Sequence, residues 1–162
     1  MWCEKKSGMK RLRKFLQLAR TDQLLLLQTI LVLGIVTLGL RILPLLTLQS
    51  RLLKLANRHT RFVPAQRSSA HRIAWAIRVA SRYIPKSTCL PRALAAQFLL
   101  IQRMYPADLQ IGITRNEDGR FEAHAWVTSG SRIILGGVHN LDHFVPLSPM
   151  KREGIEDYAS AP

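Results

Sequence analysis

The sequence predicts an α+β fold in which a helix with a cysteine in its first turn packs on a small antiparallel sheet, behind an N-terminal helical extension. Three observations predict this arrangement. Residues 93–104, which follow Cys89, are rich in strong helix formers. Residues 109–135 contain three short alternating segments separated by turn residues. The N-terminal half is basic and rich in leucine at helical spacing.

Length and cysteine content favour one intracellular domain with an extension. A chain of 162 residues can bury one hydrophobic core. Its two cysteines, Cys3 and Cys89, are too few and too far apart for a disulfide framework, which suits a reducing cytosol. We divide the chain into a leucine-rich helical extension (residues 1–66), a core (67–150) and a tail (151–162).

The net charge of +14 is concentrated in the N-terminal part of the chain. Residues 1–103 hold 19 of the 24 basic residues and two of the ten acidic residues, whereas residues 104–162 hold five basic and eight acidic residues. This asymmetry predicts an acidic partner: a peptide, a protein, a lipid surface or nucleic acid. Nucleic acid is not expected, because no nucleic-acid-binding motif is present and aromatic residues are sparse among the basic ones.

The extension is expected to be helical throughout. Residues 1–20 predict an amphipathic helix from about residue 11, which packs on the domain or docks on a membrane or partner. Residues 24–40 form the most apolar run, at the lower edge of the roughly 17–25 residues that span a bilayer. A signal peptide is not expected, because no small-residue cleavage site follows. A transmembrane helix and a buried or interfacial helical hairpin both stay open, and the hairpin is favoured.

The predicted core begins with a helix over residues 68–83, after a shorter basic helix over 51–60 and a break at Pro64. The three expected strands are residues 109–114, 121–127 and 132–135, with residues 144–147 as a short edge element. Asp-Gly, at positions 118 and 119, is typical of a tight hairpin between the first two strands.

Cys89 and His124 are the candidate catalytic residues. Ser87 or Thr88 can cap the helix that starts at Cys89, and the positive end of a helix favours a thiolate that a strand histidine can generate. Neither residue alone proves catalysis, because buried cysteines are usually inert and strand histidines are usually only hydrogen-bonded. The order of the elements favours a thiol nucleophile.

Three segments resemble the transglutaminase-like cysteine peptidases that remove leader peptides in lasso-peptide biosynthesis. They are residues 89–94 (CLPRAL), 109–113 (LQIGI) and 121–127 (FEAHAWV). The resemblance covers about residues 68–147, and more loosely the basic N-terminal half. It implies a papain- or transglutaminase-like core and the removal of a leader from a ribosomally made precursor, before a separate ATP-dependent cyclase closes the macrolactam ring.

Transferred to this chain, the resemblance makes Cys89 the nucleophile and His124 the general base. The oxyanion would be held by backbone N–H groups at the helix start, including that of Cys89. Trp126 matches the aromatic residue of the motif, and we expect it to pack beside the site without a direct role.

The third catalytic residue departs from the family pattern. The orienting acid is expected about a dozen residues after the histidine, where this chain has Gly136. Asp142 is the nearest downstream acid and our candidate for the role, and Asn140 is an amide alternative. A backbone carbonyl or a water molecule could also hold the imidazole, so that the Cys-His pair functions without an acid.

Two rival classes are a metal site and a non-catalytic binder. His139 and His143 lie four residues apart around Asp142, a spacing that could bind zinc, but no general-base carboxylate or second ligand pair accompanies them at fixed spacing. We therefore expect no metal and no cofactor. The binder alternative is a basic adaptor that holds leader peptide or membrane without cutting it, which the missing acid at Gly136 keeps open.

The resemblance also implies the partners. They are the leader segment of the precursor peptide, the lasso cyclase and a leader-recognition protein. Residues 1–66 predict helices and not a winged, strand-containing module, so we expect recognition to come from a separate chain. The expected location is the cytoplasm, with the inner face of the cell membrane as a further contact surface.

Overall fold

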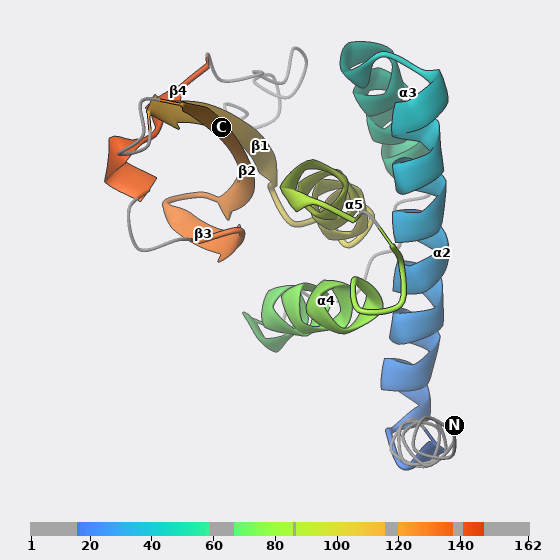
Figure 1. Cartoon of the computed structure of the whole chain (residues 1–162). Coiled ribbons are helices and arrows are strands. Elements are labelled where there is room, and N and C mark those ends of the chain that lie inside the picture. The colour runs from blue at the N-terminus through green and yellow to red at the C-terminus, as the bar shows by residue number, and fades with distance from the viewer. Residues whose placement is uncertain (1–15, 59–66, 86, 116–119, 138–140, 148–162) are drawn as a thin grey trace, which may run out of the picture.

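The computed structural model describes residues 16–58, 67–85, 87–115, 120–137 and 141–147. It has an α+β fold, as the sequence predicts (Figure 1). The elements are helices α2 (Arg20–Ile42), α3 (Leu45–Arg58), α4 (Arg67–Ala80) and α5 (Cys89–Ile101), strands β1 (Asp108–Arg115), β2 (Phe121–Ser129), β3 (Arg132–Leu135) and β4 (Val145–Pro146), and the 3-10 helix η1 (Leu141–His143).

The sheet is antiparallel, with strand order β3-β2-β1-β4. Strands β1 and β2 pair as predicted, and their register places Gly112 opposite His124; the expected turn residues Asp118 and Gly119 lie outside the described residues. The short strand β4 pairs with β1 through Val145 and Pro146, which confirms the expected edge element. The meander therefore carries His124 on a strand that is paired on both sides.

Helix α5 lies at the centre of the molecule, between the sheet and the α2–α3 pair, with α4 beside it and in contact with β3 (Figure 1). Ten of its thirteen residues are buried. Alanines at positions 93, 95 and 96 give it high helix propensity and let neighbouring elements approach closely. The helix ends at Ile101, three residues earlier than predicted, because Met104 takes a left-handed conformation (φ 62°) and Tyr105 donates its N–H to the Leu100 carbonyl.

Helices α2 and α3 form a hairpin that packs on α5. Pro44 has no N–H to continue a helix, so α2 ends before it and α3 begins at Leu45, earlier than the expected residue 51. Leu33 and Val36 of α2 and Leu52 of α3 belong to the same hydrophobic cluster as α5. The expected helix from residue 11 lies mostly outside the described residues.

Polar contacts also join the hairpin to the rest of the molecule. The side chains of Gln49 and Gln97, both buried, are hydrogen-bonded at 3.3 Å, and Gln97 also donates to the Ala107 carbonyl at 3.1 Å. Gln28 of α2 donates to Gln102 at 2.9 Å. Buried polar groups need such partners, so these bonds fix how the hairpin sits on α5.

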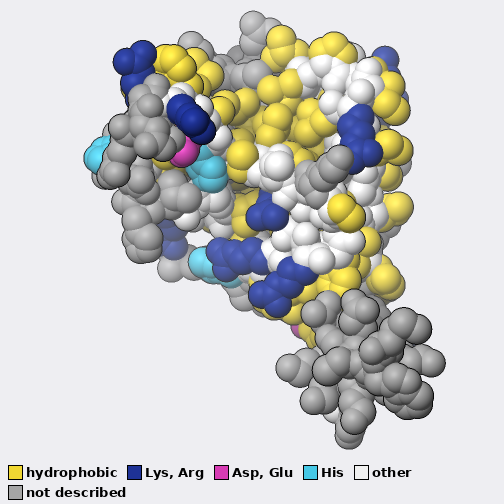
Figure 2. All heavy atoms as spheres, viewed as in Figure 1, with side chains coloured by type: hydrophobic (Ala, Val, Ile, Leu, Met, Phe, Trp, Pro, Cys, Tyr) yellow, Lys and Arg dark blue, Asp and Glu magenta, His cyan; other side chains and the backbone are white. Residues whose placement is uncertain are grey.

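One side of α2 is exposed. Among the described residues, α2 is the one helix long and apolar enough to cross a membrane by length and composition, and 28% of its apolar window is buried. A core helix of a soluble protein passes the same test, so this is weak evidence for a membrane span. Apolar side chains line the edge of the molecule formed by α2 and α3 (Figure 2).

Candidate active site

Cys89 is the first residue of α5, and Thr88 is its N-cap. Neither predicted cap bonds the helix: the Thr88 side chain makes no cap hydrogen bond, and Ser87 donates instead to the Ser81 carbonyl at 3.2 Å. Pro91 stands at the third helical position and has no N–H, which removes one of the two groups that a cap side chain can bind. The N–H groups of Cys89 and Leu90, which precede the first intrahelical bond, have no acceptor within the helix.

The thiol of Cys89 is held by a rigid support. Pro91, Ala93 and Leu94, which follow it in α5, are all buried. Cys89 itself is a free, half-buried cysteine. The arrangement places a reachable sulfur atom at the positive end of a helix that cannot easily move.

His124 is half-buried on β2, and its ring makes one hydrogen bond, between Nε2 and the carbonyl oxygen of Gly136 at 2.7 Å. A carbonyl oxygen can only accept, so Nε2 carries the proton and donates it. In the neutral imidazole the other nitrogen, Nδ1, is then the acceptor. The bond therefore fixes both the orientation of the ring and its tautomer.

The conformation at Gly136 requires glycine. Its φ is +86°, and an added Cβ would lie 2.8 Å from the Cβ of Trp126 and 2.9 Å from the Ala125 carbonyl oxygen. Both contacts are closer than real Cβ atoms come, and the second involves backbone that cannot move aside. The place where the sequence predicts an orienting acid therefore presents a backbone carbonyl to the imidazole.

Two aromatic rings pack beside the imidazole. Trp126 is buried, with its ring stacked at 6.2 Å between centroids from that of His124, and the Phe144 ring lies 5.7 Å from His124. Gly112 on the neighbouring strand leaves room for both, since an added Cβ would lie 2.9 Å from the Trp126 ring and 3.0 Å from Phe144. Trp126 thus lies where the sequence analysis expects it.

Phe144 and Gly112 were missed as site residues by sequence reasoning. Gly112 carried a usable signal, because an isolated glycine inside a strand often marks the close approach of another group. Phe144 carried none, since its contact with His124 depends on how the segment before β4 folds back over the sheet.

The structure brings Cys89 and His124 to one cavity of about 270 Å³. Gly136 lines the same cavity, as do two cationic side chains, Arg78 of α4 and Arg92 of α5. A peptide bond entering this space meets a thiol and an imidazole at the start of a helix, where the first N–H groups have no acceptor within the helix. These are the groups that acyl transfer through a thioester requires.

The remaining predicted residues are not brought into the site by the described structure. Asp142 belongs to η1, but the placement of its side chain lies outside the described residues, as do Asn140 and His139. The role of Asp142 stays a prediction, and the Nε2 atom that it would orient is already bonded to Gly136. Among the described residues, no three His, Cys, Asp or Glu side chains gather as metal ligands.

Comparison with known proteins agrees with this geometry at the level of the family. The model of the transglutaminase-like superfamily matches residues 34–149, from within α2 to beyond β4. No curated protein and no solved structure matches the chain. The match covers most of the sequence, and the superfamily is compatible with cysteine peptidase activity. The chain belongs to the transglutaminase-like superfamily.

Proposed function

We propose that this protein is a cysteine endopeptidase that removes the leader from a ribosomally made lasso-peptide precursor. The observation that carries the proposal is the shared cavity of Cys89 and His124, in which the Gly136 carbonyl holds Nε2 and leaves Nδ1 to accept a proton. The motif resemblance described above supplies the substrate class. Cytoplasmic location is part of the same proposal.

In the first chemical step His124 takes the thiol proton of Cys89, and the sulfur attacks the carbonyl carbon of the scissile bond. The negative charge that develops on the carbonyl oxygen is stabilised by the N–H of Cys89, and Leu90 offers a second such group. The C–N bond then breaks, and His124 returns its proton to the amine of the core peptide. The leader remains as a thioester on Cys89.

In the second step water resolves the thioester. His124 removes a proton from the water as its oxygen attacks, and the bond to sulfur breaks, which releases the leader as a free acid and restores the thiol. If an amine attacked instead, the same thioester would give a new amide. Hydrolysis and acyl transfer therefore share every residue of the site and differ only in the acceptor.

The proposal includes three partners: the leader segment of the precursor, a separate leader-recognition protein and the ATP-dependent cyclase. We assign docking of the recognition protein to the exposed apolar side of α2. The inner face of the membrane is the competing occupant of that side. In support, the side offers leucines and isoleucines with basic residues nearby, namely Arg20 and Arg41 at the two ends of the helix.

The test is cleavage of the precursor, followed by mass spectrometry, with the recognition protein supplied to wild type and to Cys89→Ala. We expect one peptide bond to be cut by wild type and no cutting by the variant. Equal cutting by both chains would exclude Cys89 as nucleophile. Binding without cutting by either chain would favour the adaptor alternative.

Hydroxylamine added to the wild-type reaction distinguishes the intermediate. A thioester on Cys89 gives leader hydroxamate at the same bond, in competition with the leader acid. Absence of the hydroxamate at high hydroxylamine concentration would argue against a covalent acyl intermediate.

A further inference from the structure

Among the cavities at the start of α5 in the described part of the chain, Arg92 lines two. The first is the cavity of Cys89 and His124, to which α4 contributes Arg78. The second, of about 490 Å³, lies along the turn between α4 and α5 and is lined by Arg82. Arg78 and Arg92 therefore border the cavity of the thiol, and Arg82 borders the neighbouring cavity that shares Arg92.

These arginines have no described partner. Arg78, Arg82 and Arg92 are exposed, and none forms an ion pair with a described residue. No Asp or Glu is found among the described residues that line either cavity. The guanidinium groups thus concentrate positive charge around these two cavities, one of which holds the candidate nucleophile, without neutralisation from the described part of the chain.

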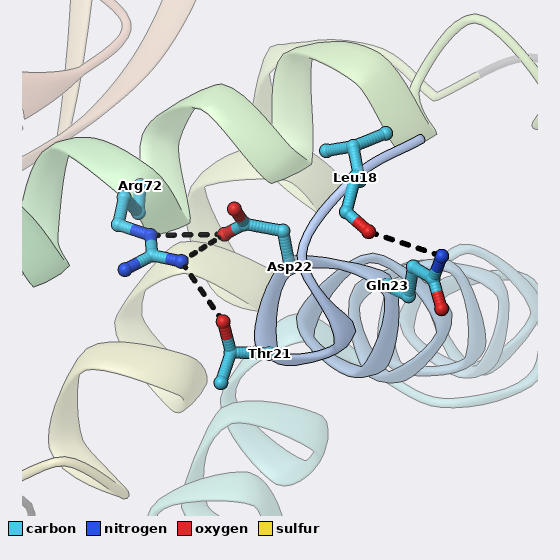
Figure 3. Close-up of polar contacts among 5 residues, drawn as sticks. All are labelled: Leu18, Thr21, Asp22, Gln23 and Arg72. Carbon is cyan, nitrogen blue, oxygen red and sulfur yellow. Dashed lines mark hydrogen bonds and ion pairs between the residues drawn. The ribbon is translucent and has the colours of Figure 1, made fainter. Parts of the chain in front are cut away.

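Arg72, which lies on the same helix as Arg78, differs from the arginines at the cavities because it has a described partner. Its guanidinium bonds the Asp22 carboxylate, with 2.9 Å between Nε and Oδ1, and also the Thr21 hydroxyl at 3.3 Å (Figure 3). Arg72 therefore joins α4 to α2. The arginines at the cavities make no such structural bond with a described residue, although Arg78 and Arg92 stand on well-packed helices.

We propose that Arg78 and Arg92, together with Arg82, form a subsite that binds a side-chain carboxylate of the peptide substrate beside the scissile bond. This inference rests on the proposed peptidase function and adds a specificity to it. Guanidinium groups bind carboxylates through charge-assisted and often bidentate hydrogen bonds. A peptide with Asp or Glu at the matching position would supply the partner that the arginines lack.

The spacing between Arg92 and Cys89 limits how far from the scissile bond the acidic residue of the substrate can lie. Arg92 follows Cys89 by three positions on α5, and side chains at this spacing lie about 5–6 Å apart at Cβ. An extended peptide advances about 3.3 Å per residue. The carboxylate therefore belongs within about three residues of the bond that Cys89 attacks.

The support beneath the subsite is preorganised. Ile77 and Ala80, which flank Arg78, are fully buried, and helices α4 and α5 pack against each other. The stems of Arg78 and Arg92 thus start from fixed backbone, and little order has to be created when the substrate binds.

The experiment exchanges charges between enzyme and substrate. Each acidic residue within three positions of the cut is replaced in turn by Lys, and kcat/KM is measured, with the recognition protein supplied, for wild type, Arg78→Glu and Arg92→Glu. Arg51→Glu is the matched control, because Arg51 is an exposed arginine of α3 that lines neither cavity. Thermal unfolding checks that each variant folds, and Arg→Gln replaces any Glu variant that does not.

We expect one acidic position at which Lys lowers the wild-type kcat/KM about tenfold, mainly through KM, which corresponds to about 1.4 kcal/mol of binding. Arg78→Glu or Arg92→Glu should lower cleavage of the natural precursor and restore cleavage of that Lys substrate, whereas Arg51→Glu changes neither. Thiolate stabilisation by the arginines would lower cleavage of all substrates alike, and such a uniform loss would overturn the inference. So would a precursor without an acid in this window.

The two proposals fail separately. If cleavage depends on Cys89 but kcat/KM is the same for every charge-exchanged pair of enzyme and substrate, the subsite proposal is wrong and the peptidase proposal stands. If wild type does not cleave, the peptidase proposal fails, and the subsite is tested by the anisotropy of fluorescent precursor bound to Cys89→Ala. The Lys substitution must then raise Kd, and Arg78→Glu or Arg92→Glu in the same background must lower it again. If Kd does not respond in this way, the subsite proposal is wrong.

Discussion

Helices α2 and α5 have similar apolar composition but opposite surroundings. Ten of thirteen residues are buried in α5, whereas four of 23 are buried in α2. Helix α2 exposes a row at helical spacing, each member more than half exposed: Leu24, Leu27, Leu31, Ile35, Leu38 and Ile42. The difference separates two uses of an apolar helix, since α5 holds a reactive residue in a fixed position and α2 covers the core on one side and leaves the other side open.

Truncating one leucine in each helix tests this comparison most strongly. Leu99 of α5 is fully buried, so Leu99→Ala should lower the free energy of unfolding by about 2–5 kcal/mol. Leu31 of α2 is 64% exposed, and Leu31→Ala should change the free energy of unfolding by no more than about 0.5 kcal/mol. Urea denaturation measures both. Equal losses would mean that the open side of α2 is packed against something in solution.

Helix α5 holds the thiol of Cys89 in position, but the thiol can transfer its proton only if the imidazole of His124 is also held in position. Gly136→Ala tests whether the Gly136 carbonyl does this. The added methyl group must displace the backbone, and with it the carbonyl that holds His124, so we expect about a 100-fold loss of kcat. Gly137→Ala is the control for an added methyl group at the same cavity: its Cβ would meet Ile133 at an ordinary 3.6 Å and displace no backbone, so it should keep kcat within about threefold.

A second control separates backbone strain from loss of orientation. Gly130 also has a positive φ, of +59°, but an added Cβ would meet nothing within 4 Å. Gly130→Ala should therefore cost roughly 1–3 kcal/mol of stability and leave kcat unchanged. A rate loss in Gly130→Ala equal to that in Gly136→Ala would remove the case for a specific role of the Gly136 carbonyl.

The smallest expected effect concerns the open side of α2. The double variant Leu31→Gln and Ile35→Gln should leave the unfolding midpoint and the basal rate unchanged, and should lower stimulation by the recognition protein about fivefold. Precursor cleavage with and without the recognition protein measures it. Unchanged stimulation, together with lost sedimentation on anionic vesicles, would assign this side of α2 to the membrane and contradict the protein contact.

Much of the fold could be predicted from the sequence. Period-two alternation and the Asp-Gly turn predicted the β1–β2 hairpin, and the helix formers after Cys89 predicted α5. The surroundings of α2 could not be predicted, because an apolar run of this length is compatible with a span, a core helix or a half-exposed helix. Only packing against α5 determines which side of it is buried.

The reactive side chains of the candidate site could be predicted from the sequence, but the main-chain group that holds His124 could not. Cys89 and His124 follow from their motifs and line one cavity. The acceptor for His124 is a main-chain atom whose position depends on the left-handed turn at Gly136 and its packing on Trp126, and no side-chain pattern encodes it. Arg78 was missed for a similar reason, since helix packing alone brings α4 to the thiol, whereas Arg92 lies in the cysteine motif itself and was not singled out.

The proposed chemistry depends on one main-chain contact: the Gly136 carbonyl holds Nε2 of His124 and so leaves Nδ1 to accept the thiol proton. Long-range ¹H–¹⁵N NMR of the Cys89→Ala variant tests this tautomer of His124 most directly, because the variant has no thiol at position 89 that could protonate the ring. His124→Gln in the same background assigns the signals. We predict that the neutral form of the ring carries its proton on Nε2. A ring protonated at Nδ1 would contradict it, because such a ring could neither donate to Gly136 through Nε2 nor accept a proton at Nδ1.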